Sequence, residues 1–109
     1  MHAPDMENKV VIVTGSARGI GQAIAERFAI EGSNVVLADL DNDGIERIAE
    51  KINTNGGSAI PIATDVAVED QVDNLFDTTL NKYGTVDVLI NNAGLISPVK
   101  HFLEVDKAW

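Results

Sequence analysis

Four short apolar runs alternate along the chain with segments in which apolar residues recur at helical spacing. The runs cover residues 9–14, 34–39, 59–64 and 86–91, and nearly all of their side chains are apolar. Strands of this composition are typical of a parallel sheet that helices cover on both faces. The pattern therefore predicts an α/β fold in which strands and helices alternate along the chain.

Each segment between the runs presents one apolar face, and glycines mark where it ends. The second segment spaces its apolar residues at i, i+3, i+4 and i+7, which is the period of an amphipathic helix. Glycine after the last turn is a common helix stop, and it is found here at Gly32, Gly56–Gly57 and Gly84. The side chains expected to pack on the sheet are Ile20, Ile24 and Phe28 in the first helix, Ile45, Ile48, Ala49 and Ile52 in the second, and Val72, Leu75, Phe76, Thr79 and Tyr83 in the third.

The order of the strands follows from the doubly wound, Rossmann-type arrangement, which gives 3-2-1-4 for the first four strands. Pro61 lies inside the third run and has no N–H to donate, so it fits an edge strand. The fourth strand would have a fifth beside it in a complete fold of this type, and no fifth run is present. Residues 97–109 are expected to form a loop and the start of a fourth helix, with Phe102, Val105 and Trp109 on one face.

Composition narrows the class of function. The 109 residues predict one domain spanning 1–109, and a net charge of −9 opposes binding to nucleic acid or to an anionic membrane. The chain has no cysteine and two histidines, so we expect neither disulfides nor a metal site. The amino-terminal residues lack the features of a signal peptide and no apolar run is long enough to span a membrane, so a cytoplasmic location is expected.

A glycine-rich turn joins the first strand to the first helix. Gly15, Gly19 and Gly21 follow the spacing G-x-x-x-G-x-G. A helix that starts after such a turn directs its free N–H groups and the positive end of its dipole toward a bound phosphate. We expect Gly15 to allow the tight turn, Gly19 to let the backbone approach the phosphates, and Gly21 to let the helix pack against the strand. The alternative for these glycines alone is a flexible turn.

Asp39 closes the second apolar run, where an acid can accept hydrogen bonds from the hydroxyls of an adenosine ribose. A carboxylate at that place would repel the 2′-phosphate of NADP, so NAD is the expected cofactor. Arg18, beside Gly19, is open to two interpretations: a phosphate ligand or a solvated loop arginine.

Three short motifs in this order resemble the short-chain dehydrogenase/reductase family: Thr14-Gly15-x-x-x-Gly19-Ile20-Gly21, Asp65-Val66, and Asn91-Asn92-Ala93-Gly94. The resemblance implies that Asp65 and Val66 frame the adenine and that Asn91 braces the sheet. Asp65 could instead cap a helix, and the asparagines could serve only as turn residues. The expected cofactor-binding residues are Gly15, Ser16, Arg18, Gly19, Ile20, Gly21, Asp39, Leu40, Asp65, Val66, Asn92, Ala93 and Gly94.

The resemblance also implies a reaction, hydride transfer between a nicotinamide and an alcohol or carbonyl carbon, with a tyrosine as general acid/base and a lysine four residues later. Tyr83 is followed at that distance by Asp87, so no catalytic residue is expected in this chain, and the chain alone is predicted to be inactive. The family's catalytic Ser, Tyr and Lys would lie beyond it. Two alternatives stay open: a non-catalytic nucleotide-binding module, and a self-assembling unit that forms a homodimer around the fourth strand or residues 99–109 in place of the missing half of the fold.

Overall fold

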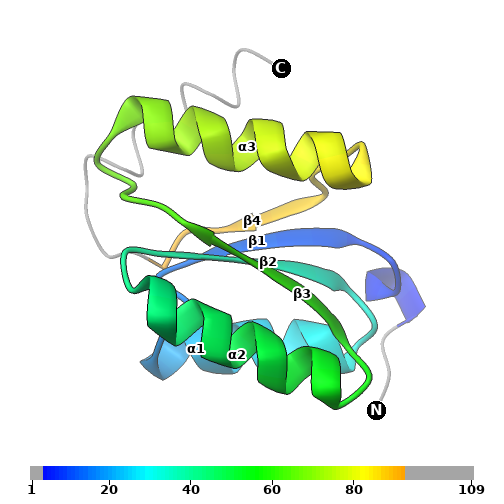
Figure 1. Ribbon diagram of the computed structural model, residues 1–109. Helices are drawn as coiled ribbons and strands as arrows, with labels where there is room; N and C mark the ends of the chain where they lie inside the picture. The colour runs from blue at the N-terminus through cyan, green and yellow to red at the C-terminus, as the bar shows by residue number, and fades with distance from the viewer. Residues whose placement is uncertain (1–3, 93–109) are drawn as a thin grey trace.

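The computed structural model describes residues 4–92, which form a four-stranded parallel sheet between two layers of helix (Figure 1). The strands lie in the order β3-β2-β1-β4, as the sequence predicts. Along the chain the elements are a 3-10 turn at Pro4–Met6, β1 at Val10–Thr14, α1 at Gly19–Ile30, β2 at Asn34–Asp39, α2 at Asn42–Thr54, β3 at Ser58–Ala63, α3 at Glu69–Tyr83 and β4 at Val88–Ile90.

The sheet separates two apolar cores. Helices α1 and α2 cover one face and α3 covers the other (Figure 1). Alternation along β1 supplies both cores, since Val11 and Val13 point toward α1 and α2 while Val10 and Ile12 point toward α3. The expected apolar faces of α2 and α3 are confirmed: Ile45, Ile48, Ala49 and Ile52 are buried in the first core, Val72, Leu75 and Phe76 in the second, Thr79 is also buried, and Tyr83 packs against the second core.

Helix α1 packs through the apolar face that its pattern predicts, with Ile24 and Phe28 against the core, except in its first turn. Ile20 is 73% exposed, so the expectation that it is buried is wrong. The buried residues of α1 are Gly21 and Ala25, and Ile24 and Phe28 are partly buried against the core. The reason is the close approach of the helix to the turn that precedes it, which places the small residues inward and turns Ile20 toward solvent.

Strand β4 is shorter than the apolar run 86–91 predicts, because Asp87 pairs with β1 through its side chain. Its carboxylate oxygen Oδ2 accepts the N–H of Val10 at 2.8 Å, and its own N–H donates to the carbonyl of Val10 at 2.9 Å. The regular pairing with β1 therefore starts at Val88. The expected helix within residues 97–109 lies outside the described residues.

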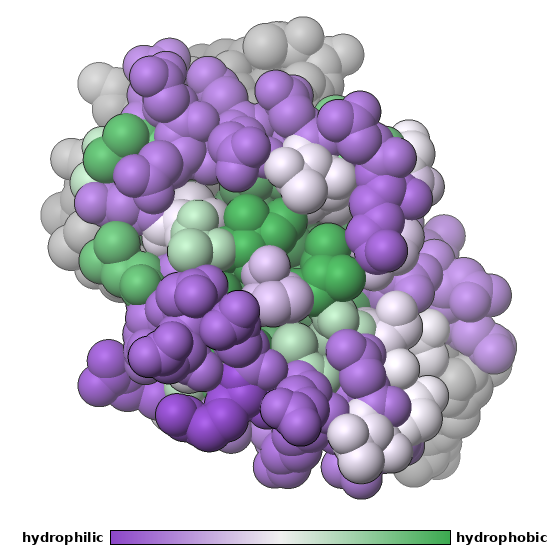
Figure 2. All heavy atoms as spheres, in the orientation of Figure 1, coloured by the Kyte–Doolittle hydropathy of each residue, from purple (hydrophilic) through white to green (hydrophobic). Residues whose placement is uncertain are grey.

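Strand β3 is an edge strand of the described sheet, as Pro61 predicts, and its free side is partly blocked against further pairing. The side-chain amide of Asn53 forms hydrogen bonds with both backbone polar groups of Ala59: it accepts the N–H at 2.8 Å and donates to the carbonyl at 2.9 Å. Two residues further along the strand, Pro61 has no N–H to offer. Apolar side chains show along this edge between the hydrophilic outer surfaces of α2 and α3 (Figure 2), but the backbone there offers few groups to an added strand.

Candidate functional site

A pocket of about 360 Å³ opens at the carboxyl ends of the strands. Parallel α/β sheets bind ligands at this end, beside the point where the strand order reverses. Two of its lining residues, Ala38 and Thr64, were not predicted as site residues. The pocket brings together these residues of the predicted set: Gly15, Arg18, Asp39, Leu40, Asp65, Val66 and Asn92.

The other predicted residues lie around the pocket without lining it. The hydroxyl of Ser16 is buried and donates to the carbonyl of Ala38 at 3.4 Å. Gly19 and Ile20 are exposed in the first turn of α1, next to the glycine-rich turn. Ala93 and Gly94 lie outside the described residues.

The glycine-rich turn requires glycine for two separate reasons. Gly15 and Gly19 both have φ of +62°, in the left-handed region that side chains disfavour. Gly21 has no such backbone constraint, but a Cβ there would lie 2.0 Å from the carbonyl oxygen of Gly15 and 2.6 Å from Nδ2 of Asn92. The lack of a side chain at Gly21 therefore lets α1 pack closely on the carbonyl of Gly15, the residue that follows β1, to which Asn92 Nδ2 donates at 3.3 Å.

The amino end of α1 is left open to an anion. Its N-cap residue, Arg18, makes no capping hydrogen bond with its side chain, and the first turn holds no acidic residue. At the start of α2, by contrast, Asp41 accepts the N–H of Gly44 at 3.0 Å. The guanidinium of Arg18 stands exposed at the pocket rim and forms no ion pair within residues 4–92. Helix α1 therefore offers its dipole and free N–H groups to the pocket.

Thr14, which the motif analysis did not single out as a ligand-positioning group, joins β1 to the end of β4. Its hydroxyl donates to Oδ1 of Asn91 at 3.1 Å and accepts the N–H of Asn92 at 2.9 Å. Thr14 is fully buried, so these bonds are shielded from water. Asn91 thus braces the sheet through its amide, as expected. The sequence signal that could have identified Thr14 is that it is a polar residue at the end of an otherwise apolar strand.

Asp39 ends β2 as predicted and lies at the pocket with its side chain partly exposed. Its Oδ2 accepts the N–H of Ala17 at 3.0 Å, and its Oδ1 accepts the N–H of Asp41 at 2.9 Å. A carboxylate oxygen can accept more than one hydrogen bond, so both oxygens keep capacity for a ligand hydroxyl.

Asp65 does not cap α3, and that alternative is wrong. The N-cap of α3 is Val68, which makes no capping bond with its side chain. Oδ1 of Asp65 accepts the N–H of Ala67 at 3.0 Å, and the N–H of Asp65 donates to Oε1 of Gln71 at 2.8 Å. These bonds fix the turn after β3 and leave Asp65 and Val66 on the pocket wall.

Comparison with known proteins decides the family. The family model described as short chain dehydrogenase matches residues 9–109. The chain belongs to the short-chain dehydrogenase/reductase family. Two members of this family resemble it closely in sequence: tropinone reductase-like 2 of Erythroxylum coca, 48% identical over 84% of this chain, and glucose 1-dehydrogenase 2 of Bacillus subtilis (strain 168), 46% identical over 83%. The chain covers 32% and 35% of these two relatives, about a third of their length.

Solved structures of short-chain dehydrogenases share the fold. A short chain dehydrogenase/reductase from Burkholderia phymatum in complex with NAD is 30% identical, with a TM-score of 0.89 over 94% of this chain and 44% of that one. The 3-ketoacyl-(acyl-carrier-protein) reductase from Brucella melitensis complexed with NADH is 40% identical, with a TM-score of 0.72 over 77% of this chain and 33% of that one. Within residues 4–92 no helix has the length and apolar character of a membrane span, and no group of three acidic or histidine side chains could hold a metal ion.

Proposed function

We propose that this chain is the NAD-binding part of an oxidoreductase that transfers a hydride between the nicotinamide and an alcohol or carbonyl carbon. The observation that carries the proposal is the meeting of the glycine-rich turn and the carboxylate of Asp39 in one pocket. Membership of a dehydrogenase family, and the NAD and NADH in two structures of similar fold, support the same conclusion.

In this proposal the pocket takes the adenosine-diphosphate end of the cofactor. The open amino end of α1, with Ser16, Gly19, Ile20 and Gly21 around it, receives the pyrophosphate. Asp39 accepts hydrogen bonds from the ribose hydroxyls, and Leu40 covers the sugar from the rim. Asp65 and Val66 lie against the adenine, and Asn92, Ala93 and Gly94 are the residues that the family resemblance assigns to the lining of the cofactor. NAD itself supplies the hydride acceptor when bound.

The preference for NAD over NADP follows from charge. A 2′-phosphate on the ribose would meet the carboxylate of Asp39 at hydrogen-bonding distance, where two negative charges repel, whereas a free 2′-hydroxyl donates to it. Arg18 could offset part of this repulsion from the rim. We expect Asp39 to dominate because its hydrogen bonds hold it in place, while Arg18 is solvated.

Calorimetric titration with NAD, NADP and ADP-ribose tests the assignment of Asp39. Asp39→Ala should weaken NAD by about 1.5–3 kcal/mol, the typical contribution of a hydrogen bond to a charged group, and should narrow the gap between NAD and NADP. Asp43→Ala is the matched control, because it removes an exposed carboxylate from the first turn of α2 that makes no contact with the pocket. Equal affinity of the wild-type chain for NAD and NADP would contradict the role given to Asp39.

The 109 residues by themselves should bind nucleotide without turning it over. Tyr83 packs against the core under α3, and position 87 is the aspartate that pairs with β1, so this pair cannot act as the tyrosine and lysine of a proton relay. A positioned general acid/base contributes about 10²–10⁴-fold to such a reaction. NADH formation from a panel of alcohols, measured by absorbance, should equal a no-protein control; formation that exceeds it and disappears with Asp39→Arg would overturn this expectation.

We also propose that the 109-residue chain, taken by itself, pairs with a second copy along β4. Among residues 4–92 the sheet has two edges. The β3 edge is partly blocked by Asn53 and Pro61, whereas β4 is an apolar strand that pairs on one side only. An apolar edge with unpaired N–H and C=O groups is a template for strand addition.

A further inference from the structure

Both carboxylate oxygens of Asp39 accept hydrogen bonds from the protein's own backbone. The two N–H groups that they accept belong to different elements: Ala17 lies in the glycine-rich turn, and Asp41 precedes the first residue of α2. Asp39 itself ends β2. One side chain therefore links a strand end, the turn that is proposed to hold phosphate, and the start of the neighbouring helix.

Packing reinforces this link. Ala17 is only 5% exposed and belongs to the core under α1 and α2. It faces Gly44 in the first turn of α2, where an added Cβ would lie 3.1 Å from the methyl carbon of Ala17 and 2.5 Å from Oδ2 of Asp41. The side chain of Asp41 in turn holds the N–H of Gly44. We refer to Ala17, Asp39, Asp41 and Gly44 together as the turn bracket.

We propose that Asp39 is a positioning residue that holds the glycine-rich turn in shape before the nucleotide arrives, through the N–H of Ala17, in addition to its contact with the ribose. The carboxyl group of Asp39 offers one acceptor oxygen to each of the two N–H groups. Asparagine has one acceptor oxygen and can hold one of the two N–H groups. Alanine can hold neither.

The consequence concerns cofactor preference. Replacing Asp39 with a small neutral residue removes the repulsion toward a 2′-phosphate but also releases the turn. Affinity for every nucleotide that uses the turn should fall, including nucleotides that make no contact with residue 39. The turn bracket itself stands on the hydrogen bonds and packing of its four residues, and only this effect on affinity rests on the proposed function.

Amide hydrogen exchange of the ligand-free chain, followed by NMR, tests the bracket without any nucleotide. In Asp39→Ala the amides of Ala17 and Asp41 should exchange about tenfold faster or more, as expected for the loss of a hydrogen bond to a charged group. In Asp39→Asn one of the two should stay protected. Asp43→Ala, the matched loss of a nearby charge, should leave both unchanged, and the amide of Ile12 in β1 reports whether each variant keeps its fold.

Unchanged exchange at Ala17 in a folded Asp39→Ala variant would overturn the proposal, as would equal acceleration in Asp43→Ala. If Asp39→Ala does not fold, the near-isosteric Asp39→Asn decides in its place: protection of both amides as in the wild type contradicts the bracket, and loss at one of them supports it.

A second measurement separates the bracket from the ribose contact. ADP and 2′,3′-dideoxy-ADP are titrated into the wild-type and Asp39→Ala chains. The dideoxy nucleotide lacks the hydroxyls that Asp39 is proposed to accept, and removing a negative charge near its phosphates should by itself tighten binding. A ribose contact alone therefore predicts equal or tighter binding in the variant, whereas the bracket predicts weaker binding. If the wild-type chain binds neither nucleotide, the proposed function fails while the exchange experiment still decides the bracket.

Discussion

At the scale of single residues, glycines of one motif are required for different physical reasons. Gly19 is constrained by its backbone, since its φ is +62° and an added Cβ would meet nothing within 4 Å. Gly21 is constrained by its surroundings, since the same atom would lie 2.0 Å from the Gly15 carbonyl oxygen. The spacing of the motif predicts that each position is glycine but cannot distinguish the two reasons.

Alanine substitutions at these two positions should therefore differ in kind. Gly19→Ala should cost about 1–2 kcal/mol of folding free energy, the penalty of the left-handed region, and leave the turn otherwise intact. Gly21→Ala should cost about 1–3 kcal/mol or more, because the turn must move, and should break the bond between Asn92 and the Gly15 carbonyl. Urea denaturation measures the first effect, and NMR shifts of the Asn92 side-chain amide measure the second. Equal shifts of that amide in both variants would contradict the distinction.

The residues that the sequence did not predict as part of the site are the ones whose role depends on contacts across the chain. Thr14 and Ala17 are ordinary residues in an apolar run and a turn, and their bonds to Asn91 and Asp39 exist because the fold brings distant segments together. The acid at the tip of β2 was predicted from its position alone. Its bonds to two backbone N–H groups were not: the bond from Ala17 depends on how closely the glycine-rich turn approaches the end of β2, and the bond from Asp41 depends on the local conformation of the two residues that follow Asp39.

At the scale of elements, apolar periodicity predicted the packing faces of α2 and α3, and that of α1 except at Ile20. Helix α2 has large buried side chains on one stripe, whereas α1 meets the sheet through Gly21 and Ala25. The pattern was based on large apolar residues and did not count Gly21 and Ala25 as buried positions. It therefore predicted, wrongly, that Ile20 is buried. The bounds of the strands were predicted to within one residue, except at the start of β4, which lies two residues later because Asp87 replaces a backbone contact by a side-chain contact.

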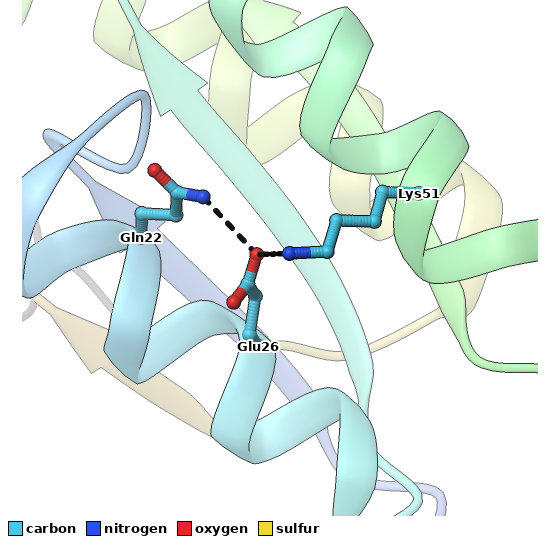
Figure 3. A network of polar contacts seen from close by, with 3 residues as sticks. All are labelled: Gln22, Glu26 and Lys51. Atoms are coloured by element: carbon cyan, nitrogen blue, oxygen red, sulfur yellow. Dashed lines mark hydrogen bonds and ion pairs between the residues drawn. The ribbon is translucent and has the colours of Figure 1, made fainter. Parts of the chain in front are cut away.

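Helices α1 and α2 are joined by a polar network whose strength depends on pH (Figure 3). One oxygen of Glu26 accepts from Gln22 at 3.1 Å on the same helix and from Lys51 of α2 at 3.1 Å. The hydrogen bond from Gln22 is the main cause that lowers the pKa of Glu26 below its ordinary value of 4.5; partial burial opposes it, and Lys51 adds to the lowering. The ionised carboxylate is therefore stabilised by folding.

The sign of the pH dependence follows from that lowered pKa. The stabilisation is fully present above about pH 4.5 and is lost as the pH falls through the lower pKa of the folded state. Because the Lys51 side chain is 59% exposed, we expect a contribution of about 0.2–1 kcal/mol. Urea denaturation at several pH values should show that Glu26→Gln removes this part of the acid destabilisation, while Glu50→Gln, an exposed control on α2, does not. A wild-type dependence on pH that persists in Glu26→Gln would contradict the assignment.

At the scale of the whole molecule, the strand order leaves two edges that the chain treats differently. The order itself was predictable, because alternating strands and helices with a glycine-rich first turn permit few arrangements. Pro61 predicted that the third strand lies at an edge of the sheet. The hydrogen bonds from the side-chain amide of Asn53 to the N–H and carbonyl of Ala59 could not be predicted from the sequence, where Asn53 is only a polar residue near the end of a helix.

Association of the 109-residue chain along β4 is testable by a substitution that spares the rest of the sheet. The N–H of Asp87 donates to β1, so by alternation the N–H of Leu89 also faces β1 and that of Val88 faces outward. Val88→Pro should weaken the dimer by about tenfold or more in dissociation constant without unfolding the monomer, since it removes an outward donor twice in a symmetric pair. Leu89→Pro, the matched control, removes a bond to β1 and should destabilise the fold itself. Sedimentation equilibrium over a range of concentrations measures the association.

In the same experiment Asn53→Ala combined with Pro61→Val should open the β3 edge and give assemblies larger than dimers. A wild-type chain that stays monomeric at all concentrations, or a dimer that Val88→Pro leaves unchanged, would exclude β4 as the interface.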